Sequence, residues 1–380
     1  MVSLPHAGRP RVLHVSAVDF TGEKLLQPQL DALVARGYDV RLACGRSSEP
    51  HWQALSHLRP VDIAFSRRAA VLATIGAVSR LWRLAWAWRP QVLHLHTPAA
   101  SLPVRLLPRW VWPRGMRVVY TVHGFLHQWP TSGRAEQLVQ RLEQLEARRT
   151  DLMLFQSAED HEQSVARRYR SRLVLLGNGV EDAWFSLPMA ERSSGALRVL
   201  FVGRLVREKG VLDLVSAVAD LPEVTLDVVG SALSSDRDPV GDELVVARQE
   251  VCPADRVRLH GSLSKAALLC LYASVDVVCL PSYREGVPRS LIEGLAAGRP
   301  AVATDIRGCR ELVITGENGL LVQPGDVHGL REALRRVAAL APHEFAAMAT
   351  AARRSVDPER REAAVVERLV EAYRSLGVRV

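Results

Sequence analysis

The first residues in this 380-residue chain that suggest chemistry are a glycine and two cations between a strand pattern and a helix pattern. The apolar run Leu197–Val202 leads into Gly203 and Arg204, and Lys209 follows just before a helical pattern. Gly203 permits a sharp backbone turn, and two cations beside a helix N-terminus attract a diphosphate. Arg offers a planar fork and Lys a point charge, which together can follow negative charge growing on a leaving phosphate. The alternative is a solvated basic turn.

Two carboxylates form a second candidate group. The strand pattern ends at Leu280, Glu285 lies on the loop that follows, and Glu293 lies about one turn inside the next predicted helix. Gly286 and Val287 complete the loop, and Gly286 permits a ligand to approach the backbone closely. Carboxylates accept hydrogen bonds from vicinal diols, so one can hold sugar hydroxyls and the other ribose hydroxyls. Alternatively, Glu293 is an ordinary first-turn residue favoured by the helix dipole.

Alternating apolar runs and amphipathic stretches must position these residues. Strands are predicted at 11–16, 40–43, 61–65, 92–95, 118–122, 152–156 and 173–176, and again at 197–202, 225–229, 257–259, 275–280, 300–303 and 319–321. Helices are predicted at 25–36, 71–88, from 99, and at 133–149, 159–169, 211–219, 242–251, 265–273, 290–297, 327–340 and 358–376. Residues 20–23 are expected to turn between the first strand and helix, and 186–195 to form a linker.

This alternation is the doubly wound signature of parallel sheets buried on both faces. We expect an α/β chain with two Rossmann-like domains that face each other across a ligand-binding cleft. The expected domains are residues 1–187 and 188–357, and residues 358–380 are expected to form a helix that packs back on the first domain.

The net charge of +8 is concentrated in the first half. Residues 1–187 carry 24 Lys+Arg and 15 Asp+Glu, whereas residues 188–380 carry 25 and 26. The stretch Ile63–Ala135 holds ten arginines, six of the eight tryptophans and no acidic residue. Cations interleaved with indoles suit an anionic membrane surface. Nucleic acid is a weaker reading because the chain shows no nucleic-acid module motif, and a third reading is that the tryptophans are simply core residues.

Cysteine usage and hydropathy indicate a reducing compartment. The five cysteines stand singly, without metal-ligand or disulfide spacing. No apolar run reaches the roughly 20 residues that a bilayer crossing needs, and the first ten residues do not resemble an export signal. We expect a cytoplasmic protein, peripheral at the inner face of the membrane.

Two further patterns resemble metal sites and are interpreted otherwise. The acidic pair in Asp236-Arg237-Asp238 sits in a polar loop rather than after an apolar strand, and is interpreted as solvated loop. His94 and His96 are expected to alternate along a strand and to face opposite sides, which argues against joint ligation of a metal. We therefore expect no metal and no cofactor.

Taken together, the ordered motifs resemble family-four retaining glycosyltransferases of the GT-B fold. The resemblance covers about 115 residues of the second half, in the order Gly203-Arg204-Leu205, Lys209-Gly210, His260-Gly261, Leu271-Tyr272, Asp276, Pro281-Ser282, Glu285-Gly286, Pro288, Glu293-Gly294-Leu295-Ala296-Ala297-Gly298-Arg299-Pro300, Thr304-Asp305, Gly308 and Glu311-Leu312-Val313. The first half is more loosely similar to the subgroup that builds bacterial surface polysaccharides, through Val18-Asp19-Phe20, His94-Leu95-His96-Thr97-Pro98, Tyr120-Thr121-Val122-His123-Gly124-Phe125 and Asn178-Gly179-Val180.

The resemblance implies roles for individual residues. Arg204 and Lys209 would bind the donor diphosphate, Glu285 the donor sugar and Glu293 the ribose. His123 would orient the sugar or its β-phosphate rather than transfer a proton, although a lone histidine is often a hydrogen-bonded structural residue.

The first βα turn departs from the family pattern. Gly22 would approach the phosphates through its backbone, but many relatives carry a Gly-Gly pair where this chain has Gly22-Glu23-Lys24. Lys24 is then a candidate for the missing phosphate contact.

The leading hypothesis is a metal-independent, retaining hexosyl- or N-acetylhexosaminyltransferase. It would use a nucleotide-diphosphate sugar, with a UDP-sugar favoured, and a saccharide or lipid-linked saccharide acceptor in surface polysaccharide synthesis. Two alternatives stay open: a nucleotide-sugar epimerase of the same architecture, and a non-catalytic nucleotide-sugar binding protein.

Overall fold

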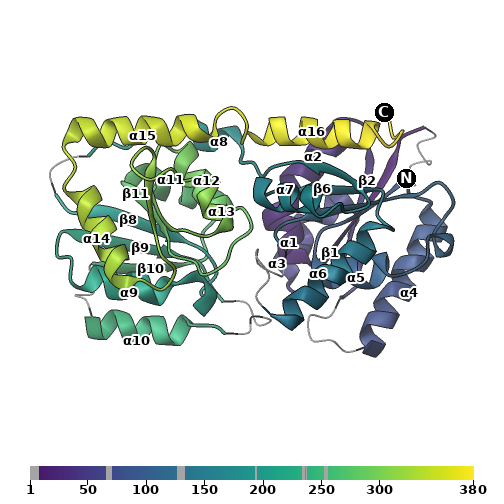
Figure 1. Ribbon diagram of the computed structural model, residues 1–380, viewed down its shortest axis with the longest axis horizontal. Coiled ribbons are helices and arrows are strands. Elements are labelled where there is room, and N and C mark those ends of the chain that lie inside the picture. The colour runs from purple at the N-terminus through teal and green to yellow at the C-terminus, as the bar shows by residue number, and fades with distance from the viewer. Residues whose placement is uncertain are drawn as a thin grey trace. The chain divides into compact units, whose positions relative to one another are not determined.

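The computed structural model describes residues 8–65, 71–125, 133–192, 195–232, 236, 238–251 and 256–380 (Figure 1). Within them the chain forms two compact units. The first runs to Gly177 and also includes Val365–Val380, and the second is Asn178–Ala364. The division falls ahead of the boundary expected at residue 187, because Trp184 and Ala190 pack into the core of the second unit. The stretch expected to be a linker therefore belongs in part to that core.

The first unit is built around a parallel sheet. Its described residues form seven strands in the order β3-β2-β1-β4-β5-β6-β7. The strands are β1 (Arg11–Val18), β2 (Asp39–Gly45), β3 (Val61–Asp62), β4 (Val92–Leu95), β5 (Arg117–Val122), β6 (Leu152–Phe155) and β7 (Arg172–Leu175). All neighbouring strands pair in parallel. The strand order reverses beside β1, which is where doubly wound sheets bind ligands at their carboxyl edge.

Helices cover both faces of this sheet. They are α1 (Asp19–Thr21), α2 (Gln27–Ala35), α3 (Glu49–Ala54), α4 (Val71–Trp88), α5 (Pro98–Arg105), α6 (Arg134–Ala147) and α7 (Ala158–Ala166), with α16 (Glu362–Arg374) from the chain's end. Alternate residues of β1 enter different cores: Leu13 packs with Leu81 of α4, and Val12 packs with Leu30 of α2. Each fully buried aliphatic side chain contributes roughly 1.5–3 kcal/mol, so burial on both faces sets the register.

The helix α16 returns to the first unit, as expected for the tail. From Val365 onward it packs beside α2, and Figure 1 shows it in yellow along that helix. Arg368 Nε donates to the carbonyl of Leu176 at 2.8 Å. Tyr373 is completely buried, and its hydroxyl contacts His94 of β4 at 2.6 Å.

A buried ionic cluster anchors β5 from the other face. Arg105 on α5 is buried, ion-paired with Glu143 at 3.0 Å and Glu146 at 2.8 Å, and lies 4.2 Å from the ring centre of Tyr120. Burial, the largest influence, raises the pKa of Glu146 to about 8. Removing one member would leave a buried charge uncompensated, so the cluster holds α5, α6 and β5 in one arrangement.

The second unit repeats the architecture. Its described residues form six parallel strands in the order β10-β9-β8-β11-β12-β13. The strands are β8 (Leu197–Val202), β9 (Val224–Val229), β10 (Val257–Gly261), β11 (Val277–Leu280), β12 (Ala301–Thr304) and β13 (Gly319–Val322). The strand order reverses at β8, with β9 on one side and β11 on the other.

Helices flank this sheet as well. They are α8 (Asp182–Phe185), α9 (Val211–Ala219), α10 (Gly241–Val251), α11 (Lys265–Ser274), α12 (Arg289–Ala296), α13 (Arg307–Arg310), α14 (Val327–Ala338) and α15 (Pro342–Val356). One continuous core joins them to both faces of the sheet. The expected α/β fold with two doubly wound sheets is confirmed.

Two local expectations differ from the structure. The segment expected to turn at residues 20–23 is helical, because α1 runs directly into a π-helical turn at Gly22–Leu26. The helix α15 was not among the predicted helices. Its apolar face is made largely of alanines, and it gains stability by packing Phe345 and Ala349 into the core.

A helix that crosses a bilayer needs roughly 20 predominantly apolar residues. None of the helices in the described ranges is both long enough and apolar enough to cross it.

Candidate functional site

Lys209 and Glu285 meet at the point of the second sheet where the strand order reverses. Lys209 follows β8 and Glu285 follows β11, and these two strands are hydrogen-bonded neighbours. Lys209 Nζ lies 2.5 Å from Glu285 Oε1, and the two side chains are only 16% and 9% exposed. Ser282 donates its hydroxyl to the same carboxylate oxygen at 2.8 Å. The sequence indicates Ser282 only as part of a motif, and the hydrogen bond shows that it holds the carboxylate of Glu285.

Two glycines let these loops pack backbone against backbone. Gly210 has a φ of +67°, and a Cβ there would lie 2.1 Å from the carbonyl oxygen of Pro281. A Cβ on Gly308, in α13, would lie 1.3 Å from the carbonyl oxygen of Gly286. Both contacts exclude a side chain. The loops after β8, β11 and β12 are therefore held together by contacts that only glycine permits.

Arg204 pairs with Asp236, a residue that the sequence pattern placed in a solvated loop. Its Nη1 donates to Asp236 Oδ1, and the Asp236 side chain is 1% exposed. The interpretation of this acidic stretch as solvated loop is therefore wrong for Asp236, although Asp238 is exposed. Pro239, close to Asp236 in the sequence, pairs with Val206 in a β-bridge. Loop composition does not predict this long-range contact or the burial of Asp236.

Glu293 lies on α12 in a closed environment. Its carboxylate accepts from Arg289 Nε at 3.3 Å and from the Tyr272 hydroxyl at 3.4 Å. Burial disfavours the charged form and raises the pKa of Glu293 to about 7, against the opposing effect of the Arg289 charge. A group poised near neutrality can change its charge when a ligand binds.

Arg289 links Glu293 to the start of the second unit. Its Nη2 contacts Glu181 at 2.9 Å, and Glu181 also pairs with Lys265 at 2.6 Å. Next to this network, Asn178 Nδ2 donates to the carbonyl of Val287 at 2.9 Å. The side chain of Asn178 thus holds the backbone of the loop that carries Glu285.

The two glycines of the second unit that were expected to contact the ligand, Gly203 and Gly286, are not in left-handed conformations. Gly203 continues the β8 ladder, with its N–H donating to Val229 at 3.0 Å. Gly286 presents its carbonyl to Gly308. Their small size serves close packing between loops, and their roles in donor binding stay predictions.

In the first unit, His123 lies directly after β5 and is half-buried. Its Nε2 is 3.3 Å from His96 Nδ1, and its ring also hydrogen-bonds the side chain of Gln156. Burial lowers the pKa of His123 to about 4, and the Gln156 bond opposes this only in part. The ring is therefore neutral at physiological pH, which agrees with an orienting role.

Gly22 and Lys24 occupy the helical turn after β1. A Cβ on Gly22 would lie 2.7 Å from the side chain of Leu42, so the glycine allows the helix to pack on β2. Lys24 Nζ pairs with Glu23 at 2.6 Å and is half exposed. Their contribution to phosphate binding stays a prediction.

The prediction that His94 and His96 face opposite sides is wrong. Residues two apart in a strand share a face, and the two ring centres lie 4.2 Å apart. Ring nitrogens of His14, His94 and His96 all lie within 4.8 Å of one another, and all three residues are buried.

The predicted site residues thus fall into separate sets. Lys209 and Glu285 are in contact, Arg204 lies against Asp236, and Glu293 lies against Arg289, all within the second unit. His123 and Gly22 belong to the first unit.

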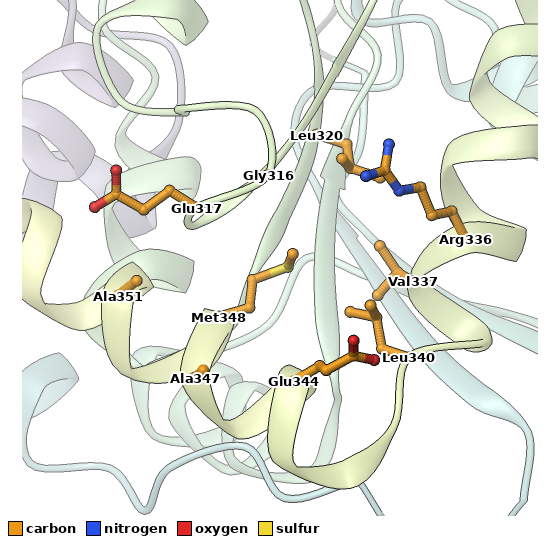
Figure 2. Close-up of a pocket in the computed structure, with 10 residues that line it drawn as sticks. All are labelled: Gly316, Glu317, Leu320, Arg336, Val337, Leu340, Glu344, Ala347, Met348 and Ala351. Carbon is orange, nitrogen blue, oxygen red and sulfur yellow. The ribbon is translucent and has the colours of Figure 1, made fainter.

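A cavity of about 530 Å³ lies elsewhere in the second unit. Figure 2 shows it between α14, α15 and the loop before β13, lined by Arg336, Glu344 and Met348 among others. That loop enters β13 at its amino end, whereas Lys209 and Glu285 follow the carboxyl ends of their strands. The cavity is therefore distinct from the predicted donor residues.

Known protein families match both halves of the chain. Residues 26–184 match the family described as glycosyltransferase family 4, and residues 196–339 match glycosyl transferases group 1. Both halves of the chain are thus similar to glycosyltransferase domains. The second match contains Arg204, Lys209, Glu285 and Glu293, and the first contains His123.

Curated relatives agree with this assignment. A glycogen synthase of Mycobacterium tuberculosis (strain CDC 1551 / Oshkosh) is 28% identical over 273 residues, which cover 70% of this chain and 64% of that protein. The aligned part thus spans slightly less than two thirds of that relative. The capsular polysaccharide biosynthesis glycosyltransferase CapM of Staphylococcus aureus is 22% identical over 332 residues, 82% of this chain and 84% of CapM.

A solved structure supports the fold. The crystal structure of Anabaena Alr3699/HepE in complex with UDP and glucose superposes with a TM-score of 0.77 at 19% identity, covering 97% of this chain and 100% of that one. The two α/β units therefore have the fold found in GT-B glycosyltransferase structures.

The contact between Gly308 and Gly286 predicts a sensitive position. Gly308→Ala should displace the loop that carries Glu285, cost about 1–3 kcal/mol of stability as an overpacking substitution, and weaken binding of a nucleotide sugar. Chemical denaturation and calorimetric titration measure the two effects. Gly241→Ala is the control, because a Cβ there meets nothing within 4 Å. Unchanged stability and affinity in Gly308→Ala would show that the loop contact does not position the site.

The raised pKa of Glu293 predicts a pH-dependent affinity for UDP. Ribose hydroxyls donate to the ionised carboxylate, so binding lowers a pKa that is about 7 in the free protein and releases a proton below that pH. Affinity should fall by up to about tenfold per pH unit below 7, as measured by titration calorimetry in buffers of different ionisation enthalpy. Glu293→Gln should remove the slope. A wild-type affinity that stays flat from pH 5.5 to 8 would exclude Glu293 as the ribose ligand.

Proposed function

We propose that the protein is a retaining glycosyltransferase that moves a sugar from a UDP-sugar to a saccharide or lipid-linked saccharide acceptor in surface polysaccharide synthesis. The observation that carries the proposal is the contact between Lys209 and Glu285 where the second sheet reverses its strand order. A cation for the diphosphate and a carboxylate for sugar hydroxyls are there placed on two adjoining loops.

The charges of this pair suit a donor that carries both groups. In the free protein the ammonium and the carboxylate neutralise each other in a largely buried place. A bound donor replaces each partner: diphosphate oxygens take the place of Glu285 at Lys209, and sugar hydroxyls take the place of Lys209 at Glu285. Because both charges are desolvated, a ligand that offers only one of the two groups leaves the other charge without a partner.

The proposed reaction balances without an external acid or base. The bond between the anomeric carbon and the leaving phosphate oxygen breaks, and the acceptor hydroxyl oxygen forms a bond to the same carbon on the same face. The acceptor proton goes to a phosphate oxygen of the departing UDP. Lys209 and Arg204 stabilise the charge that develops on that phosphate. His123, neutral at physiological pH, orients the sugar and takes no proton.

Two similar proteins support the proposed substrate class, a UDP-sugar donor and a saccharide acceptor in polysaccharide synthesis. HepE was solved with UDP and glucose, and the name of CapM places that relative in capsular polysaccharide synthesis. The residues of this chain offer donors and acceptors suited to such a ligand, with Lys209 for the diphosphate and Glu293 for a ribose. The sugar itself is proposed as a hexose or N-acetylhexosamine.

Substitutions of Lys209 and Glu285 should affect turnover and UDP affinity in different ways. Lys209→Ala should lower kcat by about a hundredfold or more, because one stabiliser of the leaving phosphate is lost. Glu285→Gln should slow transfer while leaving the affinity for UDP unchanged or higher, since UDP has no sugar and Lys209 is released from its ion pair. A donor is first chosen by thermal shift against a panel of nucleotide sugars, and turnover and UDP affinity are then measured.

Arg335→Ala is the matched control, an exposed cation on α14 paired with Glu332. Full turnover in Lys209→Ala would overturn the assigned role. Conversion of the donor to an isomer of equal mass without acceptor would identify an epimerase, and donor binding without any turnover would identify a binding protein.

The acceptor side of the proposal rests on a surface of the first unit. Of the tryptophans in its basic stretch, Trp88 and Trp112 belong to the core, and Trp129 lies outside the described residues. Trp110 is 83% exposed and Trp82 is 41% exposed. The core interpretation thus holds for part of the set, and a smaller exposed group remains.

This exposed group, named here the α4 surface, joins α4 to the turn at residues 109–111. The indole N–H of Trp82 donates to the carbonyl of Val111 at 2.9 Å, which places it next to Trp110. Leu72 and Ile75 on α4 are 84% and 59% exposed. Other exposed members are the cations Arg80, Arg83, Arg89 and Arg114. Cations attract anionic headgroups by about 1 kcal/mol each, and exposed apolar side chains can insert at the interface.

The α4 surface predicts binding to anionic vesicles, consistent with a lipid-linked acceptor at the cytoplasmic face of a membrane. The protein should co-sediment with phosphatidylglycerol vesicles more than with phosphatidylcholine vesicles, and less at high salt. Replacing Leu72, Ile75 and Trp110 together by Ser should reduce recovery. The control replaces Val245 and Val246 by Ser, two exposed apolar residues of α10. Equal recovery with both lipids removes the membrane claim.

A further inference from the structure

Four histidines occupy one face of the first sheet where its strand order reverses. In the strand register His14 of β1 lies beside His94 of β4, and His94 lies beside Val119 of β5. His96 extends the ladder, with its N–H donating to Val15 at 3.0 Å. Because residues two apart share a face, His96 and His123 continue this row toward the carboxyl edge.

Three of these histidines form a hydrogen-bonded chain. His14 Nδ1 lies 2.8 Å from His96 Nε2, and His96 Nδ1 lies 3.3 Å from His123 Nε2. His14 and His96 are 1% and 2% exposed, and His123 is half-buried. The chain therefore runs from the sheet interior to the residue predicted to orient the donor sugar.

His94 is held separately, and a metal fits this cluster poorly. Its Nδ1 lies 2.6 Å from the Tyr373 hydroxyl and its Nε2 lies 2.7 Å from the Thr121 hydroxyl. A metal shared with His14 and His96 would need a lone pair that His94 already uses, and would break the direct bond between the other two rings. The ring nitrogens of His14 and His96 are close because they are hydrogen-bonded to each other.

The chain is neutral under physiological conditions. Burial lowers the pKa of His14 to about 3 and of His123 to about 4, and holds the pKa of His96 well below its ordinary value. Each ring then carries one N–H, so each hydrogen bond needs one donor and one acceptor. Once the proton of one ring is placed, the tautomers of the other two follow.

The linked rings allow two arrangements, one with every shared proton directed inward from His123 and one with every shared proton directed outward toward it. The surroundings of His14, at the inner end of the chain, select between them. His14 Nε2 is buried, and no residue in the described ranges forms a hydrogen bond with it. If protons pointed inward from His123, this atom would be an N–H without an acceptor, and orphaned buried N–H groups are rare. If protons point outward, the atom is a bare lone pair. The proton of His14 then lies on Nδ1 and is donated to His96, and His96 Nδ1–H is donated to His123.

We propose that His14 and His96 are positioning residues that set the tautomer of His123, keeping its Nε2 occupied as an acceptor and its proton on Nδ1. His123 then has one ring hydrogen to offer, on Nδ1, which it can donate to an oxygen of the donor substrate. The kinetic consequence rests on the proposed glycosyl transfer: His123 donates a hydrogen bond and cannot receive the acceptor's proton at Nε2.

The tautomer can be measured without any substrate. Long-range ¹H–¹⁵N correlation spectra of the full chain labelled with ¹⁵N-histidine separate protonated from bare ring nitrogens, and His14, His96 and His123 variants assign the signals. His123 should be protonated at Nδ1, with no change between pH 6 and 8 given its low pKa. A wild-type spectrum with His123 protonated at Nε2 would overturn the proposal, whatever the variants do.

Paired variants of His96 test the positioning. Asn places an N–H where His96 has Nδ1–H, so His96→Asn should keep the His123 tautomer, whereas His96→Leu should let it become mixed. Transfer should fall by about tenfold to a hundredfold in His96→Leu, the scale of a displaced reacting group, and recover most of that in His96→Asn. His57→Asn, an exposed histidine of the same unit, is the control. Thermal melting checks that each variant folds.

The outcomes separate this proposal from the proposed function. The predicted tautomer with no transfer from any donor would reject the glycosyltransferase activity and leave the histidine chain standing. Transfer with an Nε2-protonated His123, or equal loss in His96→Asn and His96→Leu, would reject the chain and leave the activity standing. Zinc retained in the purified protein and ligated by these rings would also reject the chain.

Discussion

Backbone packed directly on backbone holds together the loops after β8, β11 and β12, and the placement of charge in the second unit depends on it. Gly210 lies against Pro281, and Gly308 lies against Gly286. These contacts leave no room for a methyl group, so the loops keep one spacing. That spacing puts Lys209 within 2.5 Å of Glu285 although 76 positions separate them in sequence.

The charged residues on and around these loops are paired in the free protein. Lys209 pairs with Glu285, Arg204 with Asp236, and Glu293 with Arg289, each at least partly removed from water. Buried ions cost several kcal/mol each without a partner, so pairing preserves the fold while no donor is present. A ligand that carries both phosphates and hydroxyls can replace such partners without leaving a buried charge unpaired. The same pairs thus stabilise the fold and are proposed to take part in recognition of the donor.

The first unit uses neutral groups where the second uses ions. Its histidine row lies at the same topological position, beside the strand where the order reverses, yet burial suppresses the charge of every ring described in it. A neutral chain transmits orientation through donor and acceptor roles, whereas an ion pair transmits charge. His123 at its outer end is consequently suited to hold a sugar and poorly suited to carry protons.

Most elements were predictable from the sequence, because apolar periodicity reports directly which face of a strand or helix is buried. The two parallel sheets, the loops carrying Lys209 and Glu285, and the position of Glu293 inside α12 all follow from local pattern. The helix α15 was not predicted because alanines give a weak periodic signal. The shared face of His94 and His96 was open to prediction, since it needs only the two-residue period of a strand, and was wrongly assigned.

Tertiary structure alone decided which partners these residues have. Asp236 is buried against Arg204, Lys209 bonds Glu285, and Tyr272 reaches Glu293, and the two members of these pairs stand 32, 76 and 21 positions apart in the sequence. A sequence records the chemistry of each side chain and its local period, since these depend on near neighbours. The protonation state of Glu293 and the hydrogen bonds of His123 depend on desolvation and on long-range register, which exist only once the sheets have assembled.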